Sequence, residues 1–358
     1  MRALTVRPGT ADSARVDDLP EPVAGPDDLL VDGLAVGVCG TDREIADGDY
    51  GAAPPGRDRL ILGHESLGRV RQAPAGSDFS PGDLVVGVVR RPDPVPCGAC
   101  AHGEFDMCRN DRYTEHGIKE LDGYAAERWT VAGDYAVRLD PGLADVGTLL
   151  EPTTVVAKAW EQIDRIGARA WYEPRTVLVT GAGPIGLLAA LLGTRRDLDV
   201  HVLDRVTDGP KVDAVTALGA TYHHDPVADV AGRLRPDVVV EATGAASVVF
   251  DAIAGTGTYG ITCLTGVSTP GKTVRVDAGA GNRQIVLEND VVVGSVNANL
   301  RHYRAAADIL AGTDPDWLRR LITRRVPLER FAEALEARPD DIKVVLTLTG
   351  EAAAEQRR

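Results

Sequence analysis

The sequence predicts an α/β protein with a β-rich module and a doubly wound parallel sheet. Up to about residue 150, short alternating apolar runs are separated by Gly, Pro and Asp, as in strands joined by loops. From about residue 174, continuous Val/Ile/Leu runs alternate with helical segments, which is typical of a parallel sheet covered on both faces. A glycine-rich turn follows the first of these later strands.

The β-rich module is expected to contain strands at 3–6, 29–38, 67–70, 83–89 and 135–139. A last strand at 342–348 should pair back into this module, because the later strands already complete the parallel sheet.

The second module is expected to place strands within 176–183, 200–205, 237–244, 259–266 and 290–297. Helices are expected at 184–196, 211–220 and 247–256 in this module, and a further helix at 301–311 follows it. We therefore divide the chain into one domain of 1–155 with 299–358 and a second domain of 156–298.

Composition excludes several classes of protein. The 358 residues include 39 Lys+Arg and 53 Asp+Glu, a net charge of −14, which argues against broad contact with nucleic-acid phosphates. No apolar run is long enough for a transmembrane helix, and the N-terminus lacks the apolar region of a secretory signal. We therefore expect a cytoplasmic protein with no nucleic-acid or membrane partner.

The turn after strand 176–180 carries the pattern G-x-G-x-x-G at Gly181, Gly183 and Gly186. A helix follows it, and Asp204 ends the next strand about 20 residues later, as in a dinucleotide site. Asp204 would accept hydrogen bonds from a ribose diol and repel a 2′-phosphate, so we expect NAD. Arg205 beside it leaves NADP possible.

A second group of residues suggests a metal. Cys39, His64 and Glu65 lie in the β-rich module, and Glu151 follows far along the chain. Thiolate, imidazole and carboxylate are zinc ligands, and three protein ligands leave one position for a substrate oxygen. Taken singly, Cys39 could be a small core residue and His64 a buried structural histidine. Together with a dinucleotide site, these structural roles become less favoured.

The segments GVCGTDREI, GHESLGRV and TGAGPIGLLA resemble the zinc-dependent medium-chain dehydrogenase/reductase family over nearly the whole chain. The resemblance implies a GroES-like catalytic domain and an inserted Rossmann domain. Arg90-Arg91-Pro92, residues 113–117, Leu150-Glu151-Pro152 and residues 293–297 are similar to the glucose 1-dehydrogenase branch.

This resemblance also implies roles for single residues. Catalysis is assigned to Thr41, Glu65 and Glu151, and the catalytic zinc to Cys39, His64, Glu65 and Glu151. Substrate contacts are assigned to Thr41, Glu115, Glu151, Asn297 and Asn299. Cofactor contacts are assigned to Gly181, Gly183, Pro184, Ile185, Gly186, Asp204, Arg205, Thr243, Thr265, Gly266, Val267, Ser295, Asn297 and Lys343.

Cys97, Cys100 and Cys108 fall within 12 residues, which in a reducing compartment indicates a metal site more often than a disulfide. The family's structural zinc lobe usually has four cysteines, whereas this chain has Gly103 at one of those positions. His102, Glu104, Asp106 and Asp111 are candidates for the fourth ligand, and we favour Asp111. The alternative is an empty lobe held by packing.

These observations lead to one expected function and two rivals. We expect a zinc-dependent oxidoreductase that transfers hydride from a sugar hydroxyl, C1 of an aldose such as glucose, to NAD(P). A dehydrogenase of a polyol, cyclitol or other secondary alcohol is the alternative, and a non-catalytic NAD(P)-binding sensor is a further one. The family resemblance implies a homodimer or homotetramer.

Overall fold

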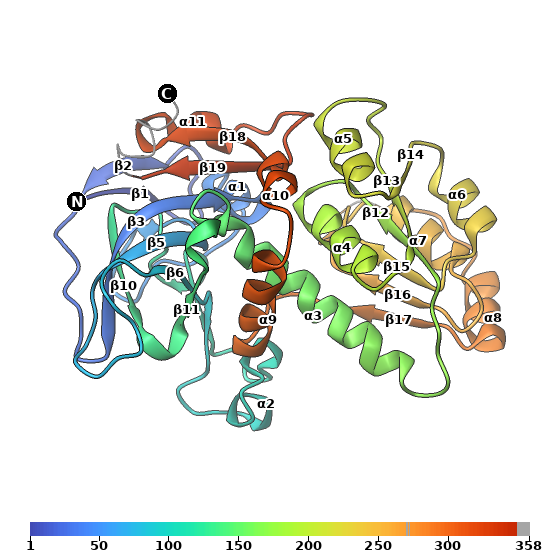
Figure 1. Ribbon diagram of the computed structural model, residues 1–358, viewed down its shortest axis with the longest axis horizontal. Helices are drawn as coiled ribbons and strands as arrows, with labels where there is room; N and C mark the ends of the chain where they lie inside the picture. The colour runs from blue at the N-terminus through green and yellow to red at the C-terminus, as the bar shows by residue number, and fades with distance from the viewer. Residues whose placement is uncertain (270, 272, 349–358) are drawn as a thin grey trace. The chain divides into compact units, whose positions relative to one another are not determined.

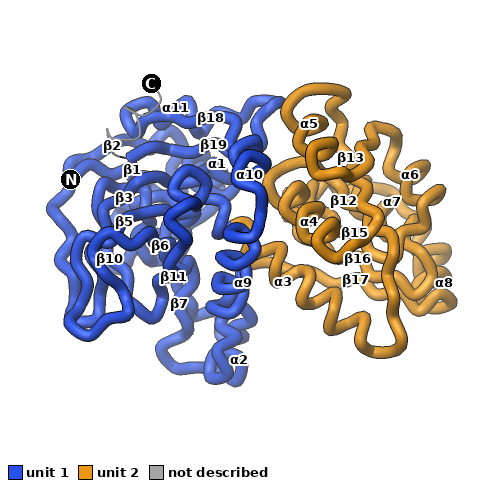
Figure 2. Tube along the Cα trace, viewed as in Figure 1, with its two compact units in different colours: residues 1–151, 298–358 blue, residues 152–297 orange. Residues whose placement is uncertain are grey.

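The computed structural model describes residues 1–269, 271 and 273–348. It divides into two compact units, coloured separately in Figure 2. Unit 1 comprises Met1–Glu151 and the described part of Ala298–Arg358, and unit 2 comprises Pro152–Asn297. The division predicted from the sequence placed the two joints at 155/156 and 298/299. In the described residues, no helix is both long enough and apolar enough to span a bilayer.

Unit 1 is rich in strands (Figure 1). Its strands are β1 (Arg2–Val6), β2 (Arg15–Asp18), β3 (Asp28–Val38), β4 (Leu60–Ile61), β5 (Glu65–Gln72), β6 (Leu84–Gly87), β7 (Arg90–Arg91), β8 (Thr114–His116), β9 (Glu120–Leu121), β10 (Arg128–Ala132), β11 (Ala136–Arg138), β18 (Ile322–Pro327) and β19 (Lys343–Thr347). Its helices are α1 (Gly40–Ala46), α2 (Gly98–Ala101), α9 (Leu300–Ala311), α10 (Pro315–Leu321) and α11 (Phe331–Leu335). Short 3-10 helices are η1 (Phe105–Met107), η2 (Gly133–Tyr135), η3 (Pro141–Leu143), η4 (Gly147–Leu149) and η5 (Leu328–Arg330).

The largest sheet of unit 1 follows the order β11-β6-β5-β3-β19-β18, with β10 also paired to β3. Strand β3 is the centre of this sheet, and buried Leu29, Val31 and Val36 on it join the core of the unit. Strand β19 pairs antiparallel to β3, with Val344 opposite Val38. The prediction that the last strand returns to the first module is therefore confirmed.

Within the described residues, unit 2 is built on a parallel sheet of six strands in the order β14-β13-β12-β15-β16-β17. The strands are β12 (Thr176–Thr180), β13 (Asp199–Leu203), β14 (Thr221–His223), β15 (Val238–Glu241), β16 (Ile261–Leu264) and β17 (Val291–Gly294). The helices are α4 (Pro184–Thr194), α5 (Pro210–Ala217), α6 (Val227–Leu234), α7 (Ala246–Gly255) and α8 (Ala278–Glu288), while α3 (Leu150–Gly167) begins in unit 1. The strand order reverses beside β12, at the place where open α/β sheets bind ligands.

Most strands of this sheet are mainly apolar because helices pack on both faces. Leu178, Leu203 and Val239, from three neighbouring strands, pack against α6 and α7. The other face is covered by α4, whose residues from Gly186 to Gly193 are all buried. Because both faces are covered, both sets of alternating side chains are apolar.

Candidate active site

Cys39 lies where strand β3 ends and helix α1 begins. It is the N-cap residue of α1, and its backbone N–H donates to Asp42 Oδ2 at 2.9 Å. Its Sγ lies 3.2 Å from His64 Nε2. The other ring nitrogen, Nδ1, lies 3.5 Å from Asp42 Oδ1, so the buried Asp42 fixes both the cysteine and the histidine. A carboxylate behind a histidine is a common second layer of a metal site.

Glu65 is the first residue of strand β5 and lies beside Cys39 and His64. It lies opposite Gly37 on β3, and a Cβ at Gly37 would come within 1.9 Å of Glu65 Oε2, so the carboxylate requires glycine there. Glu65 Oε1 accepts a hydrogen bond from Lys343 Nζ at 2.6 Å. Glu65 Oε2 is buried and has no hydrogen-bond partner among the described residues. A ligand bound next to this buried carboxylate oxygen would supply the partner that it lacks among the described residues.

The donor set fits zinc. One ligand atom from each of Cys39, His64 and Glu65 lies within 4.8 Å of the others, and these three residue types are the usual zinc ligands. Burial opposes a charge on His64, but the neighbouring Cys39 and Asp42 raise the pKa of His64 well above its usual value. The surroundings therefore favour positive charge, as a cation site requires.

Two further predicted catalytic residues lie near this group. Glu151 is in the first turn of α3 and is not part of the close three-residue group. Burial raises the pKa of Glu151 to about 7; His64 acts against this and Glu65 adds to it, so Glu151 lies within electrostatic range of both. Thr41 is half-buried in the first turn of α1, two residues after Cys39.

The predicted sugar-binding residues are held by partners that the sequence analysis did not identify. Glu115 on β8 pairs with Arg90 on β7, and the Arg90 Nη2 to Glu115 Oε1 distance is 2.9 Å with both side chains buried. Asn299 is 1% exposed and is the N-cap residue of α9. Its Nδ2 donates to Asp106 Oδ1 at 2.6 Å. Asn297, in unit 2, has a left-handed backbone with φ of 61°.

The glycine-rich turn of unit 2 has the geometry of a phosphate site. Gly181 has φ of +94°, and a Cβ at Gly186 would lie 1.7 Å from the Gly181 carbonyl oxygen, so this packing needs glycine. Gly183 is the N-cap residue of α4, and Pro184 and Ile185 occupy its first turn. The free N–H groups and positive end of such a helix attract a pyrophosphate.

Asp204 follows strand β13 and is bound to the same turn. Its Oδ2 accepts from the Ala182 backbone N–H at 2.7 Å, and its Oδ1 accepts from the Arg205 N–H at 2.6 Å. Lys211 Nζ lies 3.9 Å from Oδ2. The carboxylate is therefore oriented toward the glycine-rich turn, while Arg205 is exposed.

Glu241, at the end of β15, organises several of the predicted cofactor residues and was missed by the sequence analysis. It is fully buried, and its Oε1 accepts from the Thr243 backbone N–H at 2.8 Å. Its backbone carbonyl accepts from Thr265 Oγ1 at 2.8 Å and from the Gly266 N–H at 3.0 Å. An acidic residue at the end of a buried strand was the available signal.

The remaining predicted cofactor residues have different surroundings. Val267 is 81% exposed, whereas Ser295 is buried and its Oγ has no hydrogen-bond partner among the described residues. Lys343 is 1% exposed and is placed by the structure in the ion pair with Glu65. The sequence analysis assigns Lys343 to the cofactor, whereas in the structure its side chain pairs with Glu65 in the interior of unit 1.

The three cysteines of the 97–108 segment come together, with ligand atoms within 4.8 Å of one another. In the described part of the chain, this group has no fourth His, Asp, Glu or Cys ligand. Each candidate is held elsewhere: Asp111 by Lys119, Glu104 by Arg301, Asp106 by Asn299, and His102 by the Gly98 carbonyl. The structure thus does not bring Asp111, the favoured fourth ligand, to the thiols.

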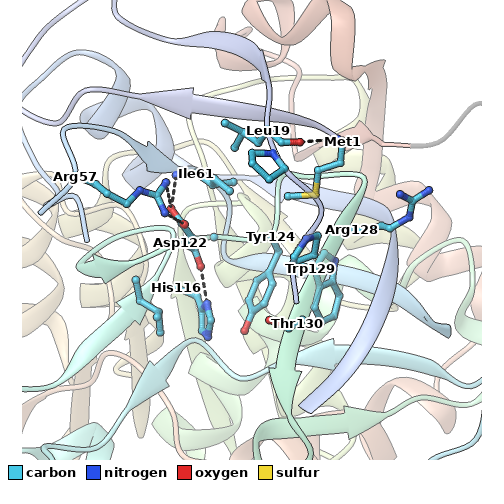
Figure 3. Close-up of a pocket in the computed structure, with 14 residues that line it drawn as sticks. Met1, Leu19, Arg57, Ile61, His116, Asp122, Tyr124, Arg128, Trp129 and Thr130 are labelled. Carbon is cyan, nitrogen blue, oxygen red and sulfur yellow. Dashed lines mark hydrogen bonds and ion pairs between the residues drawn. The ribbon is translucent and has the colours of Figure 1, made fainter. Parts of the chain in front are cut away.

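A separate cavity of about 480 Å³ lies within unit 1, lined mainly by apolar side chains from the N-terminus and from β4, β9 and β10 (Figure 3). None of the predicted site residues lines it. His116 is at its wall, where its Nδ1–H donates to the Asp122 carbonyl oxygen at 2.6 Å. This histidine belongs to the fold rather than to the predicted active site.

Comparisons with known proteins identify the family. The profile of the family "Glucose dehydrogenase C-terminus" matches residues 144–348, and that of "Alcohol dehydrogenase GroES-like domain" matches residues 25–141. A glucose 1-dehydrogenase of Methanocella arvoryzae is 40% identical, covering 97% of this chain and 99% of the relative. The chain belongs to the glucose 1-dehydrogenase branch of the zinc-dependent medium-chain dehydrogenase/reductase family. The predicted family and the expectation of an oxidoreductase are confirmed.

Further members of this family show the same similarity. A glucose 1-dehydrogenase of Thermoproteus tenax is 42% identical, covering 97% of this chain and 99% of the relative. The solved Haloferax mediterranei glucose dehydrogenase in complex with NADP, Zn and gluconolactone is 32% identical with a TM-score of 0.90. That match covers 98% of this chain and 99% of the other. The predicted fold class, a GroES-like domain with a Rossmann sheet, is confirmed.

Proposed function

We propose that this protein oxidises the C1 hydroxyl of an aldopyranose such as glucose to the lactone, using zinc and a nicotinamide dinucleotide. The observation that carries the proposal is the Cys39–His64–Glu65 group, in which His64 and Glu65 are buried and which offers three zinc ligands in surroundings that favour a cation. The glycine-rich turn at α4 supports the dinucleotide. The names of the glucose 1-dehydrogenase relatives, and the gluconolactone in the Haloferax complex, support the sugar.

In this proposal, Cys39, His64 and Glu65 hold the zinc, with Glu151 beside them. When bound, zinc supplies a Lewis acid that lowers the pKa of the sugar hydroxyl, and the nicotinamide accepts the hydride released from C1. Thr41 passes the hydroxyl proton toward solvent. Glu115, fixed by Arg90, binds hydroxyl groups of the ring and sets its orientation.

We propose that NAD is the preferred dinucleotide, with NADP as the weaker one. Asp204 puts a carboxylate beside the glycine-rich turn, where it would repel a 2′-phosphate and accept hydrogen bonds from a ribose diol. The exposed Arg205 is the residue that would favour NADP.

We also propose a homodimer or homotetramer. Strand β17 is at the edge of the parallel sheet, so its outer N–H and C=O groups are available to a second copy. Val286, Leu287 and Val292, on α8 and β17, are 64%, 63% and 38% exposed, which makes this edge apolar. Light scattering should give twice or four times the mass of one chain, whereas a monomer at micromolar concentration would exclude this assembly.

The function is tested with zinc-loaded protein on a panel of aldoses, polyols and cyclitols with both dinucleotides. Glucose or a related aldose should give the highest kcat/KM, with lactone as the product. Cys39→Ser should lose several orders of magnitude in kcat, because serine replaces a thiolate by a poor ligand. The matched control is Cys263→Ser, since Cys263 is a buried core residue of β16. Turnover that survives Cys39→Ser would contradict the zinc assignment, and preference for a polyol would contradict the substrate.

A further inference from the structure

The segment between Cys100 and Cys108 contacts helix α9 as well as belonging to the group of three cysteines. It contains η1, in which Asp106 is 6% exposed. Asp106 Oδ1 accepts a hydrogen bond from Asn299 Nδ2 at 2.6 Å, and the neighbouring Glu104 pairs with Arg301 at 3.3 Å. Two acidic side chains therefore fasten this segment to the first turn of α9.

Asp106 also contacts Arg90, the partner of Glu115, through its main-chain carbonyl group. Arg90 Nη1 donates to the Asp106 carbonyl oxygen at 3.1 Å. Arg90 Nε and Nη2 both approach Glu115 Oε1, at 3.0 and 2.9 Å. The guanidinium also lies 3.6 Å from the centre of the Tyr113 ring. Arg90 is thus held between a carboxylate, a carbonyl and an aromatic face.

These contacts form one chain from α9 to Glu115. The Asp106 carboxylate is tied to Asn299, which fixes η1. The fixed turn directs its carbonyl to Arg90, and Arg90 directs Glu115. Long side chains such as Arg and Glu lose rotamer entropy when they are ordered, so partners that already hold them in place lower the cost of binding a sugar.

We infer that Asp106 is a positioning residue for sugar recognition, acting through Asn299 and Arg90 on Glu115. This inference rests on the proposed function. It assigns the cysteine segment a role in specificity besides stability, because the turn that holds Arg90 lies between two of its cysteines. Asp106 itself need not touch the sugar.

The test compares Asp106→Ala with Asp106→Asn in the full-length, zinc-loaded protein. Kinetics are measured with glucose and with its monodeoxy analogues, and Glu115→Gln identifies the hydroxyl group that Glu115 binds. Glu104→Ala is the matched control, because it removes the other acid that fastens the segment to α9 and leaves the contacts of Asp106 in place.

Asp106→Ala should raise KM for glucose about tenfold, or about 1.4 kcal/mol, with kcat and the dinucleotide KM nearly unchanged. It should also lose discrimination at the same hydroxyl as Glu115→Gln. Asp106→Asn keeps an oxygen that can accept from Asn299, so it should restore KM to within about threefold of the native value. Glu104→Ala should keep the native discrimination.

Equal loss of kcat/KM on every analogue, with native discrimination retained, would overturn the inference and leave a structural role. If Asp106→Ala does not fold, Asp106→Ser carries the same comparison, because the shorter side chain weakens the contact with Asn299 and keeps a polar group at this position. A native protein inactive on all sugars would instead refute the proposed function. The tether would then still be tested by hydrogen exchange, which should rise at the first turn of α9 in Asp106→Ala; unchanged exchange would refute the tether.

Discussion

Replacing Lys343 by Met should strongly destabilise unit 1. Lys343 Nζ lies 2.6 Å from Glu65 Oε1, and the two side chains are 1% and 3% exposed. At an effective dielectric constant of about 20, this attraction is about 6 kcal/mol. Removing one partner of a buried pair costs about 3–5 kcal/mol, because it leaves the other charge buried without its counter-charge. Met keeps the length of the side chain, so most of this loss is electrostatic.

The free energy of unfolding should be measured by urea denaturation of zinc-free protein, followed by tryptophan fluorescence. The control is Lys119→Met, whose partner Asp111 is 82% exposed, so its loss should be much smaller than that of Lys343→Met. The double variant Glu65→Gln/Lys343→Met should be more stable than the sum of the single losses predicts. A loss below about 1 kcal/mol for Lys343→Met, or strict additivity in the double variant, would refute this reasoning.

Three further predictions concern other parts of the chain. Burial and the neighbouring Arg91 lower the pKa of His116 to about 3, although its bond to Asp122 acts in the opposite direction. Below about pH 6.5 the unfolded chain therefore binds a proton on His116 that the folded chain does not bind. The free energy of unfolding should fall by about 1.4 kcal/mol per pH unit from there toward pH 3. In urea denaturation at several pH values, His116→Asn should flatten this slope. Cys100→Ala should lower the melting temperature and leave kcat nearly intact, whereas a large loss of kcat would place the cysteines in the chemistry. Asp204→Gly should narrow a native NAD preference of about tenfold in kcat/KM, and a native preference for NADP would contradict the role of Asp204.

Much of the fold could be predicted because its signals are local. The runs at 29–38 and 176–180 became β3 and β12, and the glycine-rich turn lies between β12 and α4 as expected. The return of 342–348 to the first module followed from counting strands. Apolar period and turn residues determine such features over a few residues, so one sequence is enough.

Several helices were not predicted, and the two longest of them, α3 and α8, show physical reasons. Helix α3 contains the β-branched run Thr153 to Val156, which has low helix propensity, after Pro152 in its first turn. Helix α8 has no buried residue, and its two glycines interrupt any apolar stripe. The α8 segment shows no helical period, whereas α3 does bury Val156, Ala159, Trp160 and Ile163 at helical spacing beyond its β-branched start.

The sequence was enough to predict which residues form the site, but not which side chains contact and hold them. Cys39, His64 and Glu65 were expected together, and the structure brings them together. The partners that hold the site, Arg90 and Lys343, come from segments distant in sequence and joined by sheet pairing. Such pairings depend on strand register, which a single sequence does not determine.

The balance of charge around Cys39 explains why its surroundings suit a metal. Asp42 and Glu65 are buried and Glu151 is near them, whereas Lys343 forms its ion pair with Glu65. Without a divalent cation, such a site takes up protons: burial together with Glu65 and Asp42 raises the pKa of Glu151, and the neighbouring Cys39 and Asp42 raise the pKa of His64 against the effect of burial. A cation that binds here must displace those protons. Zinc affinity should therefore rise with pH through the neutral range, because binding the metal and releasing protons are one equilibrium.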